Sequence, residues 1–184
     1  MKTLNLTLTL LPFLLAGCAA MSVEECQVAN WAQVGEQDGQ LGNSNRLASY
    51  YKSCEKVGVQ PNQQLYNQAY QQGLKRYCQP AVIFDKSLTG SGNYSVCPIE
   101  QHAVLRPYYD VGSAYYAAKR EKKQLEDDLE RYQGYLLDKK LSQEKRNNYI
   151  DKIRALKDDY RTVERDYAVA RRDLERFKRE RRLP

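Results

Sequence analysis

Cysteines are the residues of this 184-residue chain whose number and spacing most directly imply chemistry. A thiol can bind a metal ion, form a disulfide or carry a covalent modification. Five cysteines are present, but the only histidine that could join them as a metal ligand is His102, and no Cys-x-x-Cys pair occurs. This spacing is poor for zinc, so we expect no metal and no cofactor.

The first cysteine, Cys18, follows an apolar segment at the N-terminus. Lys2 precedes an apolar run over residues 4–15. Its length of about a dozen residues suits the hydrophobic region of a signal peptide and is too short to span a bilayer. Residues 15–18, Leu-Ala-Gly-Cys, resemble a bacterial lipobox. The resemblance implies that residues 1–17 are a lipoprotein signal peptide that is removed. Before this cut Cys18 receives a diacylglycerol on its sulfur, and after it the new N-terminus receives a fatty acid such as palmitate.

The same resemblance predicts where the protein is located. A single acyl chain binds a membrane weakly, whereas several give stable anchoring. Ala19, rather than Asp, follows Cys18. Under the sorting rule of Gram-negative lipoproteins, this implies the outer membrane, with the protein on its periplasmic face and a Gram-negative host inferred. A plain secreted protein with a leftover thiol is the alternative.

The four remaining cysteines predict disulfides, because an exported chain reaches an oxidising compartment. They are Cys26, Cys54, Cys78 and Cys97. Four cysteines allow three pairings, and the sequence leaves all three open. We favour Cys26–Cys54 with Cys78–Cys97, because sequential pairing closes one moderate loop in each half of the region. Each loop would add about 3 kcal/mol by constraining the unfolded chain.

Small residues four positions apart suggest two helical faces. Trp31, Gly35 and Gly39 repeat at the same spacing as Leu65, Ala69 and Gly73. Glycine inside a helix costs about 1 kcal/mol relative to alanine, so its use needs a cause. Close packing of two helices is the simpler cause, and a groove where a ligand meets the backbone is the alternative. The possible binding face consists of Trp31, Gly35, Asp38, Gly39, Tyr66, Ala69, Tyr70 and Gly73.

Three stretches carry a resemblance to a known family. They are WAQVGEQDGQLG at Trp31 to Gly42, YNQAYQQGLKRYC at Tyr66 to Cys78, and GSGNYSVC at Gly90 to Cys97. With Cys54 between the first two, they resemble a proteobacterial lipoprotein family known as domain of unknown function 2799, over roughly residues 24–118. The resemblance implies an envelope lipoprotein. It implies no activity and no catalytic residue.

The C-terminal part shows strong helical periodicity. Apolar residues alternate at spacings of four and three, which is the heptad pattern of a coiled coil. The downstream seam is Tyr149, Ile153, Leu156, Tyr160, Val163, Tyr167, Ala170, Leu174 and Phe177. The upstream seam is Val111, Tyr115, Ala118, Lys122, Leu125, Leu129, Tyr132 and Leu136.

A phase slip between the two seams predicts an antiparallel hairpin. Leu136 and Tyr149 are thirteen residues apart rather than fourteen, and Ser142 can cap a new helix. We therefore expect helices at about residues 108–139 and 143–181. The rival is a single long helix that dimerises through its seam.

The predicted fold is therefore mostly α. A small disulfide-stapled helical module, rich in Cys, Gly and Tyr, spans residues 18–106, and a charged coiled-coil hairpin spans 107–184. Shorter helices are expected at 30–41, 47–56 and 62–77. Val82-Ile83-Phe84 is expected to form a short strand or an apolar plug.

No catalytic motif is found, so we expect no enzymatic activity. Glu36 and Asp38 are the only carboxylates inside the family motif, and on a short exposed helix they are expected to be solvated or capping groups.

The net charge of the chain and its distribution limit which classes of partner are expected. The net charge of +6 arises after residue 118, and Arg171 to Pro184 is strongly basic. This stretch is expected to be a solvated face, with contact to an anionic polymer or lipid head groups as the alternative. Nucleic acid is not expected as a partner of an exported protein.

The expected function is that of a lipid-anchored envelope protein whose hairpin meets an envelope protein, or its own copy, in the periplasm. The alternative is a peptidoglycan-binding envelope module, in which the glycine-faced helices grip glycan or peptide stems.

Overall fold

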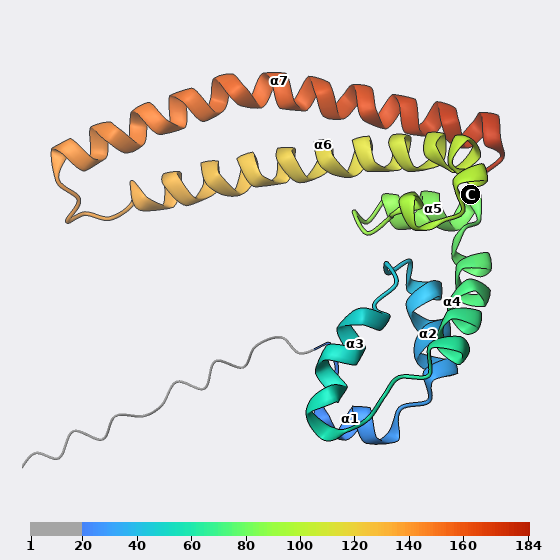
Figure 1. Cartoon of the computed structure of the whole chain (residues 1–184). Helices are drawn as coiled ribbons and strands as arrows, with labels where there is room; N and C mark the ends of the chain where they lie inside the picture. The colour runs from blue at the N-terminus through green and yellow to red at the C-terminus, as the bar shows by residue number, and fades with distance from the viewer. Residues whose placement is uncertain (1–19) are drawn as a thin grey trace, which may run out of the picture.

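The computed structural model describes residues 20–184, so Cys18 and the expected signal peptide lie outside the described residues. Within the described part the chain forms seven α-helices and no strand (Figure 1). The helices are α1 (Val23–Val28), α2 (Trp31–Leu41), α3 (Leu47–Cys54), α4 (Gln63–Tyr77), α5 (Pro80–Ser87), α6 (His102–Tyr135) and α7 (Gln143–Arg181). Three 3-10 turns accompany them: η1 (Glu55–Val57), η2 (Tyr94–Val96) and η3 (Ile99–Gln101). The expectation of a mostly helical fold is confirmed.

Side-chain caps set the starts of the short helices. Ser22 and Glu25 form a reciprocal capping box before α1. The side chain of Asn30 accepts from two backbone N–H groups at the start of α2, and that of Asn62 accepts from Leu65 N at the start of α4. Gly42 ends α2 with a φ of 70°, a left-handed conformation that glycine adopts without strain.

Helices α2 and α4 run parallel and pack at very close range (Figure 1). A Cβ atom at Gly35 would collide with the carbonyl oxygen of Tyr66, and one at Gly39 with that of Tyr70. Conversely, a Cβ at Gly73 would collide with the carbonyl oxygen of Glu36. The repeated small residues therefore serve close packing of the two helices.

The core of this first module is built from aromatic residues. Rings follow one another through Trp31, Tyr50, Tyr66 and Tyr70, with successive centroids 6.0, 5.9 and 6.0 Å apart. Tilted and offset arrangements such as these are the favourable geometries for aromatic pairs. Leu47 and Leu74 complete the cluster.

The segment Val82-Ile83-Phe84 is helical, which corrects the expectation of a strand or irregular plug. It lies in α5, where Pro80 occupies the first turn and so loses no helical hydrogen bond. Ile83 and Phe84 are fully buried, so the segment still supplies apolar core. A three-residue apolar run has no period long enough to distinguish a strand from a helix.

Helices α6 and α7 form the antiparallel hairpin, and the rival single helix is excluded within this structure. At 1.5 Å per residue the arms are about 51 and 58 Å long. Ser142 caps α7, and the guanidinium of Arg146 donates to the carbonyl oxygens of Leu136 and Asp138 at 2.9 and 3.2 Å. These bonds close the turn between the arms.

Helix α6 begins six residues earlier than expected, so the expected boundary at 106/107 falls inside it. Leu105, in its second turn, is 1% exposed and belongs to the core of the first module. Pro107 is the sixth residue of the helix, so its missing N–H leaves the carbonyl oxygen of Ala103 without the usual i→i−4 hydrogen bond. The hairpin is thus continuous with the stapled module.

Both seams are buried or half-buried along the hairpin. Lys122, the one polar residue of the upstream seam, pairs with Glu126 at 3.6 Å and with Glu164 of the other arm at 3.8 Å. At the base, the Phe177 ring packs against Phe84 of α5 and Tyr108 of α6, with centroids 6.0 and 5.1 Å apart. The seams therefore hold the arms together, and an aromatic contact docks them on α5.

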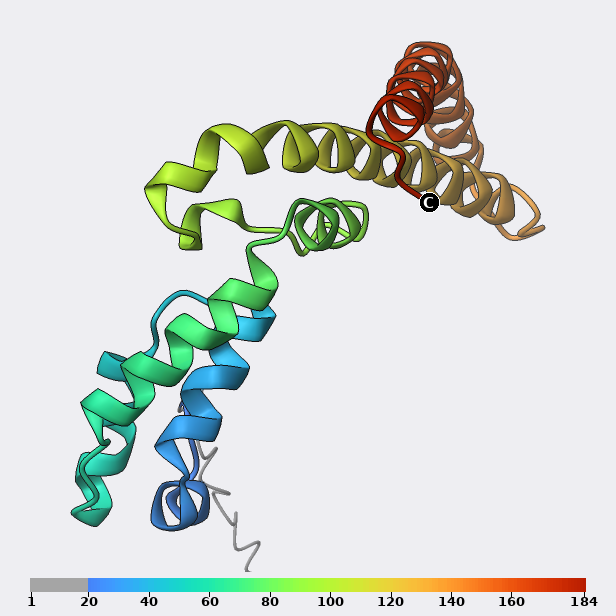
Figure 2. The same ribbon diagram turned by 90° about the vertical axis from the view of Figure 1, so that its right-hand side faces the viewer.

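The hairpin lies across the end of the α2–α4 pair, and α6 separates most of α7 from the first module (Figures 1 and 2). Within residues 20–184, no helix is long and apolar enough to cross a membrane.

Candidate functional site

The most distinctive polar group of the described residues is the carboxylate of Asp38, which is 4% exposed. Its Oδ2 accepts hydrogen bonds from the hydroxyls of Tyr50 and Tyr66, both at 2.8 Å. Its Oδ1 accepts from the side-chain amide of Asn43 at 3.0 Å. One carboxylate on α2 is therefore bound by groups from α3, α4 and the α2–α3 loop.

Arg46 lies at the solvent side of this cluster. Its guanidinium is 3.9 Å from Asp38 Oδ1 and 5.5 Å from the centroid of the Tyr50 ring, and 42% of its side chain is exposed. Its backbone N–H donates to the Tyr66 hydroxyl at 3.1 Å. Arg46 thus supplies a positive charge close to the buried carboxylate while its outer donors stay in water.

Burial and the carboxylate both affect the two tyrosines. The pKa of Tyr50 is raised to about 12, first because the phenol is desolvated and second because it donates to Asp38. The pKa of Tyr66 is raised as well, again mainly by desolvation. The hydroxyls therefore remain protonated near neutral pH and act as hydrogen-bond donors.

This arrangement is a cross-tie between helices. Buried charge is expensive unless it is paired and hydrogen-bonded, and here three donors and a nearby guanidinium meet that need. Within the described residues, every buried side-chain polar atom has a hydrogen-bond partner. A surface hollow of about 380 Å³ adjoins the cluster, between α1, α2 and the start of α3.

Asp38 corrects the expectation that the motif carboxylates are solvated or capping groups. It points into the module because α2 packs there against Tyr50 and Tyr66. Glu36 points elsewhere and pairs with Arg76 of α4 at 2.7 Å on the surface. The two carboxylates therefore do not form a catalytic pair.

The possible binding face, which was the alternative to close helix packing, is occupied by that packing. Asp38 points into the core from α2, and Ala69 is half-buried on α4. The others lie buried in or beside the α2–α4 contact: Trp31, Gly35, Gly39, Tyr66, Tyr70 and Gly73. Backbones that approach this closely leave no room for a ligand between them.

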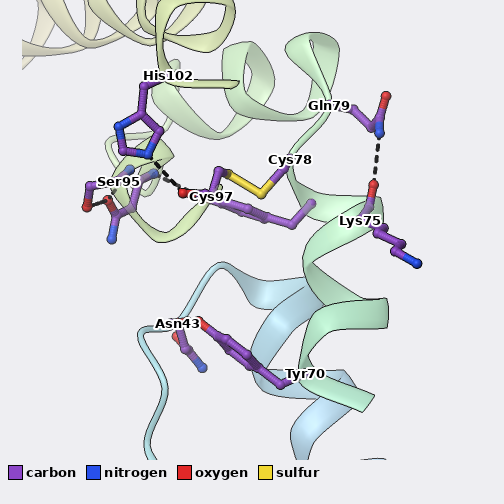
Figure 3. The surroundings of a disulfide bond; sticks show 10 residues. Asn43, Tyr70, Lys75, Cys78, Gln79, Ser95, Cys97 and His102 are labelled. Carbon is purple, nitrogen blue, oxygen red and sulfur yellow. Dashed lines mark hydrogen bonds between the residues drawn. A yellow bond between two sulfur atoms is a disulfide. The ribbon is translucent and has the colours of Figure 1, made fainter. Parts of the chain in front are cut away.

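The four cysteines of the first module form Cys26–Cys54 and Cys78–Cys97, which is the favoured pairing. The first bond joins α1 to the end of α3. The second joins the end of α4 to the segment that leads into α6, as Figure 3 shows. There His102 lies 2.9 Å from the carbonyl oxygen of Cys97, which ties the start of α6 to the disulfide.

Figure 3 also shows Tyr70 reaching from α4 to the α2–α3 loop, where its hydroxyl donates to the carbonyl oxygen of Asn43 at 2.8 Å. Asn43 is therefore held both by Tyr70 and by its own bond to Asp38. In residues 20–184, no group of three or more His, Cys, Asp or Glu is gathered so that it could hold a metal ion.

Sequence reasoning missed the partners of Asp38. Tyr50, Tyr66 and Asn43 are 12, 28 and 5 residues away along the chain, so no local spacing marks them. The one available signal was an excess of tyrosine, 15 residues in all, in a chain with only three phenylalanines. Buried tyrosines need hydrogen-bond partners, and a buried carboxylate is a suitable acceptor.

Comparison with curated proteins and comparison with solved structures each found no match. One family description does match, over the segment that contains α2 to α5, both ends of the Cys78–Cys97 bond and the start of α6. Residues 30–114 match the family described as "Protein of unknown function (DUF2799)", so the chain carries a domain of unknown function over that segment.

Proposed function

We propose that this chain is a lipid-anchored cell-envelope protein without enzymatic activity, which presents the α6–α7 hairpin to a partner in the periplasm. Cys18 carries the lipid and holds the chain to the periplasmic face of the outer membrane of a Gram-negative cell. The stapled module lies next to the membrane, and the hairpin is the surface that meets the partner.

The observation that carries the proposal is the pairing of the cysteines. The four cysteines of the first module are bonded to one another and are at most 6% exposed. Buried structural disulfides are typical of exported proteins. Cys18 is the remaining cysteine of the chain, and it stands in the lipobox-like tetrad after the apolar N-terminal run.

The shape of the hairpin supports a presenting role. Its arms extend about 51 and 58 Å and bury a continuous seam, so the hairpin is a stiff projection rather than a loop. An anchor confines such a projection to a plane and raises its effective concentration toward partners in the same layer.

The geometry of Asp38 supports a non-enzymatic role. A general acid or base needs a pKa near the working pH and a free path to a substrate. The two tyrosines beside Asp38 have raised pKa values, and the carboxylate is occupied by donors of the chain itself. The cluster is therefore suited to holding helices together.

Mass spectrometry of the native protein from membrane extracts tests the anchor. We expect a chain that begins at an acylated Cys18, with the four paired cysteines open to alkylation only after reduction. The matched control, Cys18→Ala, should keep the fold and both disulfides but carry no acyl chain at residue 18. A full-length, unacylated wild-type chain with reduced thiols would contradict the proposal.

Site-specific photo-crosslinking along the hairpin tests the partner. A crosslinker at exposed positions of α6 and α7 should trap a discrete product in intact cells, and the same group at exposed Val28 on α1 should not. Absence of any product at every hairpin position, together with a monomeric hairpin, would argue against presentation to a partner.

A further inference from the structure

A row of six arginines runs along the outer face of α7. Successive members are seven, four, seven, four and three residues apart, which keeps all of them on one side of the helix. All are exposed. We call this row the arginine ridge, and its members are Arg154, Arg161, Arg165, Arg172, Arg176 and Arg179.

The ridge faces away from the rest of the molecule. At 3.6 residues per turn it lies about half a turn from the buried seam, to which Ile153, Val163 and Phe177 belong. Helix α6 lies between most of α7 and the first module (Figure 1). From Arg154 to Arg179 the ridge is about 38 Å long.

The ridge is only weakly neutralised by the chain itself. Arg154 and Arg176 each pair with the aspartate three residues before them, at 2.9 and 2.7 Å. Arg161 and Arg165 have longer contacts of 4.0 and 3.5 Å to Asp158 and Asp166. Pairs this exposed contribute little and exchange readily with other anions. Among the ion pairs of residues 20–184, none involves Arg172 or Arg179.

We propose that the arginine ridge binds the acidic face of an α-helix in the partner protein. The inference rests on the proposed function for the existence of that partner, and it names the partner's chemistry. Carboxylates on one helix face recur every three, four or seven residues, which is the same axial repeat of about 5 to 10 Å as the ridge. The planar fork of an arginine side chain matches a carboxylate in two parallel hydrogen bonds.

Two other anionic surfaces fit less well. A bilayer surface would favour apolar anchors, but on α7 the large exposed apolar side chains are Ile150 and Val169, each at 40%. A polymer with closely packed charges, such as polyphosphate, would meet the aspartates that flank the ridge at residues 151, 158 and 173. Carboxylates spaced like those of a helix face can seat between these aspartates.

The test uses the detergent-solubilised mature protein and two synthetic helical peptides of equal composition. One peptide carries glutamates at spacings of three and four on one face, and the other has them scattered around the helix. We expect the first peptide to bind and the second to bind about tenfold more weakly or worse. Equal binding of both peptides would overturn the proposal.

Matched variants locate the contact. The quadruple change of Arg161, Arg165, Arg172 and Arg179 to Gln should weaken binding of the first peptide about tenfold or more. The control variant changes four exposed basic residues away from the ridge to Gln, so it alters the net charge by the same amount. It should weaken binding of the first peptide about twofold or less. The control residues are Lys119, Arg120, Lys139 and Lys140. Equal losses in the two variants would mean unspecific attraction and would overturn the proposal.

A third variant guards against loss of helix. Changing all six ridge arginines to Lys keeps the charge and the helix propensity but removes the fork, so we expect binding between that of the wild type and that of the Gln variant. Circular dichroism checks that α7 is retained.

Ridge-dependent binding to phosphatidylglycerol vesicles or isolated peptidoglycan, without binding of the peptide, would also overturn the proposal. Acylation of Cys18 is not needed here, so failure leaves the anchor proposal intact.

Discussion

The hydroxyl of Tyr66, on α4, donates a hydrogen bond of 2.8 Å to the carboxylate of Asp38, on α2, at a site where both side chains are almost fully buried. Tyr50 of α3 donates to the same oxygen at the same distance. Three helices therefore meet at one negative charge. Because removing one partner leaves a buried polar group unsatisfied, this point should dominate the stability of the first module.

Tyr66→Phe removes one donor from Asp38 and should lower the free energy of unfolding by about 1.5 to 3 kcal/mol, the range for a hydrogen bond to a charged group. Urea denaturation measures the change. Tyr51→Phe is the matched control, since the Tyr51 hydroxyl donates to the carbonyl oxygen of Pro61 at the surface and should cost about 1 kcal/mol or less. Equal losses would show that Asp38 is not a special acceptor.

Stability should fall at alkaline pH because of Tyr50. Its pKa is about 12 in the folded protein and about 10 in the unfolded chain, so burial favours the protonated form. The stabilisation is complete below pH 10 and is lost as the pH rises from 10 to 12. It amounts to about 2 to 3 kcal/mol by linkage.

Urea denaturation at a series of pH values checks this. The Tyr50→Phe variant lacks the ionising group, so its stability should decline less than that of the wild type over the same pH window. Parallel decline of the two proteins would contradict the prediction.

Gly39→Ala should destabilise the α2–α4 pair strongly. The new Cβ would lie 2.8 Å from the backbone N of Leu74 and closer still to the Tyr70 carbonyl oxygen, so the helices must move apart. Overpacking of this kind costs about 1 to 3 kcal/mol or more. Thermal unfolding followed by circular dichroism measures it.

Gly134→Ala is the control, and its effect on the stability of the protein should have the opposite sign to that of Gly39→Ala. Gly134 is the second-to-last residue of α6, and a Cβ there would meet no heavy atom within 4 Å. Alanine should therefore stabilise the protein slightly through helix propensity, by less than the value of about 1 kcal/mol for a helix interior. Destabilisation at both glycines would mean that the packing explanation for Gly39 is wrong.

Phe177→Ala should loosen the base of the hairpin. The ring is 9% exposed and packs on Phe84 and Tyr108. Its removal leaves a cavity, which should lower the free energy of unfolding by about 3 kcal/mol. Hydrogen exchange should accelerate in the last turns of α7. The surface change Val169→Ala, at 40% exposure on the same helix, should alter the free energy of unfolding by about 0.5 kcal/mol or less. Unchanged exchange in Phe177→Ala would contradict the docking of α7 on α5.

Replacing Cys78 and Cys97 together by Ala should cost about 2 to 5 kcal/mol, because the bond closes a loop with a sequence separation of 19 residues. The bond also fixes the segment before α6, so the start of that helix should lose exchange protection first. Replacing Cys26 and Cys54 should lower the free energy of unfolding by a similar amount but leave the exchange protection of α6 unchanged. Loss of protection in the same segment for both double variants would contradict the separate roles of the two bonds.

The sequence by itself determined the elements whose signals are local. The heptad seams with their phase slip predicted the hairpin, and Ser142, Asn30 and Asn62 mark helix starts because a cap depends on neighbouring residues alone. The disulfide pairing was one of three possibilities, and the preference for sequential pairing, with one moderate loop in each half of the region, selected the observed one.

Only the tertiary structure decided what the motif residues do. The small-residue spacing was visible in the sequence, but whether Gly35 and Gly39 face a ligand or another helix depends on where α4 lies. Likewise the sequence alone predicts that Asp38 is a surface carboxylate. Its partners Tyr50 and Tyr66 are 12 and 28 residues away along the chain, and only the fold places them beside it. The physical reason is that burial is set by packing between distant segments, whereas periodicity and capping report only on residues within a few turns.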